Sequence, residues 1–545
     1  MAVKFPRKRF TGGFSLKIRT RVMSVLGGLA LAAVGLAQVS GPTPLAWRWA
    51  QPTSVAPSGV PTVVGNSVVV AVGSRIYSLD KETGNQNWKY PAAEAIDGSF
   101  RTGVLHHGNV VVAAADNQYI YAVDAATGES KWQYNSDRPI NGRPVMCGKL
   151  LVFAVGDDQL MAVDSENGQP AWTAPYKVFD RMQGSLTAVN ANVVFFTQKN
   201  ELVSLNTLNQ KSDWRRKFTT VNADVAPVLF GDTLYMNAGT FLSAVSASNG
   251  VPRLERNLGE VLMFSPMVSS SGIAVATRDG NLMFLDSNGR PQSWRDAAGK
   301  SVPAKVNLGT AAIAPPSQSG KAVIVPTSNG AMNMYDMTNG KVLWSFTLRP
   351  HTAGLKFKVR TANGEEERPV IAVPAAGPAL SLGDSVMILS QDGSLLCFNN
   401  SFGVDVTAPE VKMAWPMPGS QVNGRQLDVV FQVEDQSTGV NDATIAVTAN
   451  GQPCIYEFGR DGVLVVRFNN FVKNPQLRDG RVAFKVTVSD WLGNQRTMEY
   501  GLFIDNALKP LGTPQSTLGA GGGTQGGGGG PSRGGGGLGG GGGGG

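Results

Sequence analysis

The residue types that support metal or nucleophilic chemistry are few in this chain, and they are scattered. Its 545 residues include 3 His and 3 Cys. The pair His106-His107 stands before Gly108-Asn109, where we expect a solvent-exposed turn, because a metal site needs further ligands at the right geometry. Asp157-Asp158 and Asp279-Gly280 are expected in hairpin turns, since neither continues into a twelve-residue calcium loop with a closing Glu. The sequence therefore predicts no metal site.

No segment has the spacing of a familiar catalytic motif. The chain lacks a Gly-x-Ser-x-Gly elbow, a phosphate loop, a His-Glu-x-x-His helix and a Cys-x-x-Cys-His site. Cys147, Cys397 and Cys454 have apolar neighbours, so we expect buried free thiols. A disulfide between Cys397 and Cys454 is the alternative, with Cys147 as the odd thiol. Three cysteines exclude a disulfide scaffold, and we assign no catalytic residue.

The sequence does repeat a turn in which an Asp is followed by Gly four residues later and by Trp eight residues later. The clear copies contain Asp80, Gly84 and Trp88, then Asp124, Gly128 and Trp132, then Asp164, Gly168 and Trp172, and finally Gly340 and Trp344. Weaker copies end at Trp214, Leu254 and Trp294. The Asp carboxylate can accept turn N–H groups, Gly supplies a positive φ, and the flat Trp ring can fill a gap between sheets. We therefore predict a structural role for these residues rather than ligand contact.

The spacing of this turn identifies the elements that position it. Its copies follow one another at intervals of 40 to 50 residues, which suits one four-stranded propeller blade. Short β-branched runs such as Val68–Val72 lie between Gly and Asn within each period. Seven turns close seven blades, and an eighth begins near Pro369 without a Trp strand of its own. Ala46–Trp49 can supply that strand and close the ring, which removes two open sheet edges. We predict an all-β protein with an eight-bladed β-propeller over residues 45–405.

The pattern strand-Asp-x-x-Thr-Gly-x-x-x-Trp resembles the pyrroloquinoline-quinone-like (PQQ-like) propeller repeat, over roughly residues 45–405. That family includes quinone-dependent dehydrogenases and non-catalytic propellers. The compact eight-bladed layout resembles more the propeller lipoprotein of the bacterial barrel-assembly machinery, although this chain lacks a lipidation Cys and has extra C-terminal regions. The resemblance to the dehydrogenases implies a calcium ion and a catalytic Asp, often beside a disulfide of adjacent Cys. The chain has no adjacent Cys pair and no Asp that matches the catalytic one, so we expect no cofactor.

The positive charge of the chain is concentrated at its N-terminus. The formal charge is +8, and seven Lys and Arg lie in the first 21 residues, so the remainder carries about +1. Such a balance excludes a general role in binding nucleic acid. An apolar stretch follows, with Gly35 and Ala37 spaced as at a signal-peptidase site. We predict a signal peptide over residues 1–37, with an uncleaved membrane anchor as the alternative. Either one places the body in the periplasm, the cell envelope or the extracellular space.

Beyond Thr407-Ala408-Pro409 the repeat ends and the composition changes. Alternating strands are separated by the turn segments Asp435–Val440, Asn450-Gly451 and Asp490–Asn494. Residues 406–507 are therefore expected to form a β-sandwich. They resemble bacterial immunoglobulin-like modules, which mostly act as spacers or adhesion units. Residues 508–545 are dominated by Gly, and we predict a disordered tail because they offer no apolar surface to bury.

One insertion interrupts the repeat between the last two blades, from His351 to Arg368. Asn363-Gly364 is a strong hairpin signal within it. The basic residues before that signal could face Glu365–Glu367 across the hairpin. Loops on a rigid scaffold commonly carry binding, although a charged insertion without function is the alternative. The candidate partner-facing residues are Lys356, Lys358 and Arg360.

These features favour an exported, non-catalytic β-propeller that serves as a protein-binding scaffold in the cell envelope. Its expected partners are envelope or surface proteins, with no nucleic acid, and the N-terminus is a possible membrane tether. A PQQ-dependent dehydrogenase is the first alternative, suggested by the repeat family. A surface adhesion or glycan-binding protein is the second, suggested by the C-terminal module. The sequence leaves the oligomeric state open.

Overall fold

The computed structural model describes residues 39–221, 225–296, 298–352, 356–361, 364–401, 404–459 and 461–511, with the backbone alone for 356–361 and 364–369. Every regular element in these ranges is a β-strand. No helix within them is long and apolar enough to cross a membrane. The predicted signal peptide and nearly all of the predicted tail lie outside the described residues.

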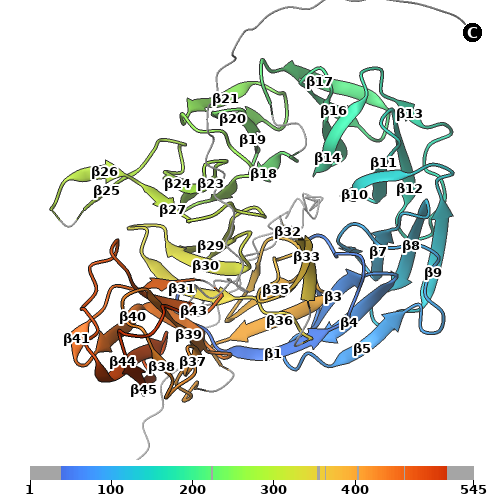
Figure 1. Cartoon of the computed structure of the whole chain (residues 1–545). Helices are drawn as coiled ribbons and strands as arrows, with labels where there is room; N and C mark the ends of the chain where they lie inside the picture. The colour runs from blue at the N-terminus through green and yellow to red at the C-terminus, as the bar shows by residue number, and fades with distance from the viewer. Residues whose placement is uncertain are drawn as a thin grey trace, which may run out of the picture. The chain divides into compact units, whose positions relative to one another are not determined.

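Eight antiparallel four-stranded sheets follow one another around a common centre, as the blades of a β-propeller (Figure 1). Blades one to four are β2(Thr62–Val64)–β3(Ser67–Val72)–β4(Arg75–Asp80)–β5(Gln86–Tyr90), β6(Leu105–His107)–β7(Val110–Ala114)–β8(Tyr119–Asp124)–β9(Ser130–Asn135), β10(Ile140–Cys147)–β11(Leu150–Val155)–β12(Gln159–Asp164)–β13(Tyr176–Lys177) and β14(Met182–Val189)–β15(Asn192–Thr197)–β16(Glu201–Asn206)–β17(Lys211–Lys217). Blades five to eight are β18(Val228–Phe230)–β19(Thr233–Ala238)–β20(Phe241–Ser246)–β21(Pro252–Asn257), β22(Met267–Ser269)–β23(Gly272–Ala276)–β24(Asn281–Leu285)–β27(Lys305–Asn307), β28(Ser317–Ser319)–β29(Ala322–Pro326)–β30(Ala331–Asp336)–β31(Val342–Thr347) and β34(Leu380–Leu382)–β35(Ser385–Leu389)–β36(Ser394–Asn399)–β1(Leu45–Ala50). The predicted eight-bladed propeller is confirmed.

The last blade takes its outer strand from the start of the chain. Strand β1 runs antiparallel to β36, with Trp47 opposite Cys397 and Trp49 opposite Leu395. This is the strand that the sequence predicted would close the ring. We call the β1–β36 pairing, which joins the two ends of the propeller, the seam.

The buried β-branched runs are explained by contacts on both sides of each blade. In β3, Val69 and Ala71 belong to a core shared with blade two, whereas Val68, Val70 and Val72 belong to a core shared with blade eight. Side chains alternate between the two faces of a strand, so a strand packed on both faces is apolar throughout. One apolar core of this kind lies between each pair of neighbouring blades, eight in all among the described residues.

Two blades depart from the regular repeat. In blade six the outer strand is β27, and Trp294 lies instead in a separate hairpin formed by β25(Ser293–Arg295) and β26(Ser301–Pro303). In blade three the outer strand β13 has two residues, and Trp172 precedes it. The sequence pattern suggests that each repeat Trp belongs to a blade strand, but this is not so for Trp172 and Trp294.

The region after the propeller forms two sheets around one apolar core. The first sheet has the order β37(Glu410–Trp415)–β39(Leu427–Glu434)–β43(Val463–Phe468)–β42(Glu457–Phe458). The second has the order β38(Gln421–Val422)–β45(Gln495–Ile504)–β44(Gly480–Asp490)–β40(Val440–Ala449)–β41(Gln452–Pro453). We call this region the C-terminal sandwich; its resemblance to immunoglobulin-like modules stays a prediction.

Candidate functional site

The repeated turn residues form part of the framework. The carboxylate of Asp80 accepts the N–H groups of Glu82 and Thr83 at 3.0 and 2.8 Å. Asp124 and Asp164 make the same pair of contacts in their own turns. The hydrogen bond from the Thr83 N–H is the main reason that the pKa of Asp80 lies below its ordinary value, although partial burial opposes it. These Asp side chains are committed to the turns, as the sequence predicted.

The repeat Trp residues pack against the turn glycines of the next blade. A Cβ atom on Gly84, which has a φ of +72°, would lie 2.6 Å from the Trp47 ring. Gly128 and Gly168 stand in the same relation to Trp88 and Trp132, so the rings fill the gaps between blades. Trp172 contacts the following blade through its indole N–H, which donates to the carbonyl of Thr207 at 2.8 Å.

Among the residues that the structure describes, the His and Cys side chains do not gather into a site. His106 and His107 are the last two residues of β6 rather than turn residues. His106 is exposed, and its Nε2 lies 2.9 Å from the carbonyl oxygen of Gly108. All three cysteines are free and buried, as predicted, and burial raises the pKa of both Cys147 and Cys397 to about 12. Such thiols are not nucleophiles at neutral pH.

The insertion after blade seven forms a hairpin of its own. Strand β32(Lys356–Thr361) pairs antiparallel with β33(Gly364–Pro369), and the register sets Lys358 opposite Glu367 and Arg360 opposite Glu365. The predicted pairing of the basic strand with the acidic strand is therefore present in the backbone. The side chains of Lys356, Lys358 and Arg360 lie outside the described residues, and their role in partner contact stays a prediction.

A cavity of about 530 Å³ lies at the base of this hairpin. Propeller residues line it on one side and the C-terminal sandwich lines it on the other. Its lining includes Arg48, Arg349, His351, Ile371, Gln432 and Glu434. Arg349 pairs with Glu434 at 3.0 Å, so two of its charges already neutralise each other. The cavity is a mixed polar and apolar recess beside the insertion.

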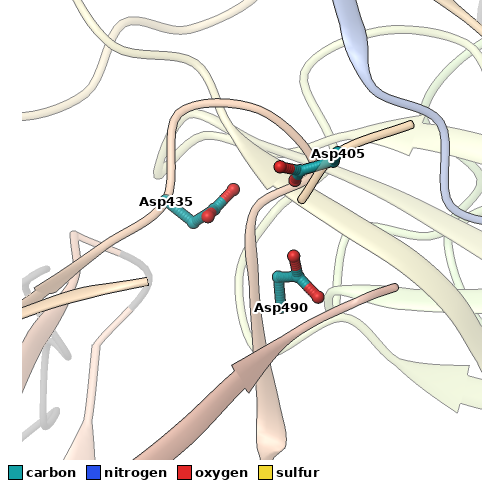
Figure 2. Close-up of side chains that lie close together, drawn as sticks. All are labelled: Asp405, Asp435 and Asp490. Atoms are coloured by element: carbon teal, nitrogen blue, oxygen red, sulfur yellow. The ribbon is translucent and has the colours of Figure 1, made fainter. Parts of the chain in front are cut away.

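Three carboxylates meet beside the junction between the propeller and the sandwich. Figure 2 shows Asp405, Asp435 and Asp490 turned toward one another, and one oxygen of each lies within 4.8 Å of the others. Asp405 follows blade eight, Asp435 follows β39 and Asp490 ends β44. Carboxylate oxygens are the ligands that Ca²⁺ and Mg²⁺ prefer. Among the described residues, this is the group whose donor atoms could hold a divalent ion.

Hydrogen bonds fix the orientation of these carboxylates. Thr438 Oγ1 donates to Asp405 at 2.7 Å, and the Gly439 N–H donates to Asp435 at 2.8 Å. Burial opposes the ionisation of Asp405, but hydrogen bonds from threonine side chains, including Thr438, hold its pKa below the ordinary value. Burial raises the pKa of Asp435, and the charges of Asp405 and Asp490 raise it further.

From the sequence, Asp435 and Asp490 are expected in turns, and no metal ligands are predicted. The available signal is an Asp at the end of each of two strands, followed by Gly within four residues. The sequence does not reveal that these two turns and the linker residue Asp405 reach the same place. They come together because the two strands end on the same side of the sandwich, next to the propeller.

The segments that precede the innermost strands approach one another closely in part of the ring. A Cβ atom on Gly377 would lie 2.4 Å from the carbonyl oxygen of Gly59, and one on Gly59 would lie 3.0 Å from the Cα of Gly103. Glycine is required here because backbone meets backbone.

The sequence matches a family model described as outer membrane protein assembly factor BamB, over residues 93–222 and 211–428. These stretches span blades two to eight and the start of the sandwich, which is more than half of the chain. No curated protein matches the sequence.

Solved structures that are similar to this chain include a BamB protein and a methanol dehydrogenase. BamB from Moraxella catarrhalis is 13% identical with a TM-score of 0.47, over 67% of this chain and 97% of that chain. Sqt1 from Saccharomyces cerevisiae is 10% identical with a TM-score of 0.49, over 66% and 100%. A europium-containing methanol dehydrogenase is 12% identical with a TM-score of 0.46, over 68% and 84%.

Proposed function

Because the chain belongs to the family of the outer membrane protein assembly factor BamB, we propose that it is an exported, non-catalytic β-propeller that binds other proteins in the cell envelope. The observation that carries the proposal is the family match, which covers residues 93–428. The description of that family names an assembly factor of outer membrane proteins. The proposed partners are therefore proteins of outer membrane assembly.

The surface proposed for partner contact is the insertion hairpin with the recess at its base. The repeat turns are short, and their Asp side chains are hydrogen-bonded within the turn. These turns therefore offer few surface features that a partner could recognise. By contrast, the β32–β33 hairpin projects between blades seven and eight as a separate two-stranded sheet. The recess of about 530 Å³ beside it is large enough to accept several side chains of a partner.

The proposal is tested by cross-linking the purified full chain to envelope fractions and identifying what is captured. Three variants are compared with the parent: deletion of residues 352–366, charge reversal at Lys356, Lys358 and Arg360, and a control with Lys81→Ala and Glu82→Ala. We expect the deletion to abolish capture of assembly proteins and the control to retain it. Charge reversal should slow association and weaken its dependence on salt. Capture that survives the deletion but is lost in the control would contradict the proposed surface.

The absence of catalysis is proposed as well, and it has a separate test. The sequence supports it, since the chain has no adjacent Cys pair of the kind found in quinone-dependent dehydrogenases. The purified chain is incubated with PQQ and calcium, and reduction of a redox dye is followed with a range of alcohols. We expect no reduction above the rate without protein. Saturable dye reduction would establish the dehydrogenase alternative instead.

A further inference from the structure

One loop and one aromatic side chain of the C-terminal sandwich form hydrogen bonds with the propeller. The described residues from Val39 onward belong to one compact unit. Within it, the loop Glu434–Gly439 and the side chain of Trp491 reach blades seven and eight. We call this loop together with Trp491 the latch. Its hydrogen bonds are made with β1, which forms one side of the seam, and with β31 of blade seven.

The first contact replaces one that the regular blades make with each other. The indole N–H groups of Trp132 and Trp214 donate to carbonyls in the turn of the following blade, at 3.1 Å each. Trp344 of blade seven instead donates to the carbonyl of Thr438 in the latch, at 2.8 Å. Its side chain is completely buried. At this position the sandwich thus supplies a hydrogen-bond partner that elsewhere comes from a neighbouring blade.

The second contact runs in the opposite direction. The indole N–H of Trp491 donates to the backbone carbonyl of Ser345 in β31 at 3.1 Å, and its ring packs against the core shared by blades seven and eight. Gly439 lies so close that a Cβ atom there would stand 3.0 Å from the same carbonyl oxygen. The sandwich and blade seven are therefore joined by two reciprocal indole hydrogen bonds over a buried apolar contact.

The third set of contacts reaches the N-terminal strand itself. The backbone N–H of Leu45, the first residue of β1, donates to the carbonyl of Ser437 at 3.1 Å. Arg48 of β1 donates to the carbonyl of Arg349, and the guanidinium of Arg349 pairs with Glu434 at 3.0 Å. The start of β1 is consequently bonded to β36 along one edge and to the latch at its first residue.

From these contacts we propose that the C-terminal sandwich is a latch that keeps the propeller closed at its seam. Strand β1 has no covalent link to blade eight, and its pairing with β36 is the place where the ring can open. The latch bonds to β1 and to blade seven together, so β1 cannot leave without breaking contacts to the sandwich. This role goes beyond partner binding, and it differs from the spacer or adhesion role expected from the sequence.

Hydrogen exchange on the full chain tests the proposal. The double variant Trp344→Phe, Trp491→Phe removes both indole donors but keeps aromatic rings. We expect the amides of β1 and β36 to exchange roughly 5- to 30-fold faster, as for a loss of one or two hydrogen bonds. Amides in β15 and in the sandwich strand β44 should keep their protection. The matched control is Trp132→Phe, which removes the same kind of bond at a regular blade junction and should leave β1 unchanged.

Two results would overturn the latch. One is unchanged exchange of β1 and β36 in the double variant. The other is equal acceleration in β1 and β44, which would mean that the sandwich itself had been destabilised.

Swapping the charges of Arg349 and Glu434 gives a second, independent test of the latch. Arg349→Glu and Glu434→Arg are each expected to speed exchange of β1, because each places like charges at the contact. The combined variant should recover most of the protection of the parent. Failure of the combined variant to recover, while both single variants remain folded, would also count against the latch.

Discussion

At the scale of single residues, one Asp side chain organises each repeat turn. Asp124 accepts two backbone N–H groups, from Ala126 and Thr127, and also binds Asn109 on the neighbouring strand connection at 2.7 Å. Lys131 stands 3.3 Å from the same carboxylate. The carboxylate thus fixes the conformation of the turn, and the turn determines where the following Gly and Trp lie.

The first prediction concerns this carboxylate. Asp124→Ala should lower the free energy of unfolding by about 1–2 kcal/mol, since turn N–H groups lose their acceptor. The hydrogen bond from Ala126 is the main cause that holds the pKa of Asp124 below its ordinary value of 3.8. Because its pKa is lower in the folded state, the ionised carboxylate stabilises the folded state at pH values above the ordinary pKa. This contribution is lost as the pH falls through the folded pKa. The difference between the parent and Asp124→Asn should thus shrink below about pH 4 in denaturant titrations. A difference that stays constant with pH would contradict this account.

A second prediction separates backbone strain from packing. Gly65→Ala and Gly84→Ala both place an L side chain at a positive φ, of 59° and 72°. A new Cβ meets nothing within 4 Å at Gly65, but it would lie 2.6 Å from the Trp47 ring at Gly84. Gly65→Ala should cost about 1 kcal/mol, and Gly84→Ala on the order of 1–3 kcal/mol more. Thermal unfolding of both variants checks the prediction. Equal losses of stability would show that the Trp47 ring moves aside without an energetic cost.

At the scale of elements, the first strand of the fold completes the last blade. Strand β1 contributes Trp47 to the core between blades eight and one. Without β1, the outer edge of β36 would be unpaired and open to other chains.

The third prediction follows from this pairing. Deletion of residues 38–50 should lower the melting temperature of the propeller, because β36 loses its partner and Trp47 leaves the core. The control is deletion of residues 512–545, a truncation at the other end that removes none of the described residues. The control should melt with the parent in circular dichroism. A β1 deletion that also melts with the parent would remove the argument from ring closure.

The sequence predicts what is local and repeated, whereas it does not predict the contacts between the propeller and the sandwich. Asp80, Gly84 and Trp88 recur at fixed spacing because each turn is a short-range structure, so blade number and ring closure could be derived from them. Trp294 has the expected spacing from Leu254 but lies in the β25–β26 hairpin, and the inserted residues lengthen only the following interval, to Trp344. The meeting of Asp405, Asp435 and Asp490 depends on which sandwich turns reach the propeller. Nothing in the local pattern encodes that contact, nor the bond from Trp344 to Thr438.

At the scale of the whole molecule, stability is distributed over similar units. Eight apolar cores lie between neighbouring blades, and a ninth lies inside the sandwich. No blade is complete without its two neighbours. The contacts of Trp344, Trp491 and Leu45 join the sandwich to the same unit.

The fourth prediction is that the propeller and the sandwich unfold together. Calorimetry of the full chain should show one cooperative transition, since the indole bonds and the buried contact at blade seven link the two regions. The double variant Trp344→Phe, Trp491→Phe should broaden this transition or split it, while Trp132→Phe should shift it as a whole. Two resolved transitions in the parent would mean that the regions are energetically independent.

The position of β1 has a consequence for the time at which the protein becomes complete. Trp47 is synthesised about 350 residues before its partner Cys397. At a synthesis rate of about 5–20 residues per second, β1 waits on the order of 20–70 s for its partner strand. Thr438 and Trp491 emerge later still. A chain interrupted before residue 394 therefore has a row of blades whose first and last edges are both exposed to proteases and chaperones, and only a finished chain can hide them.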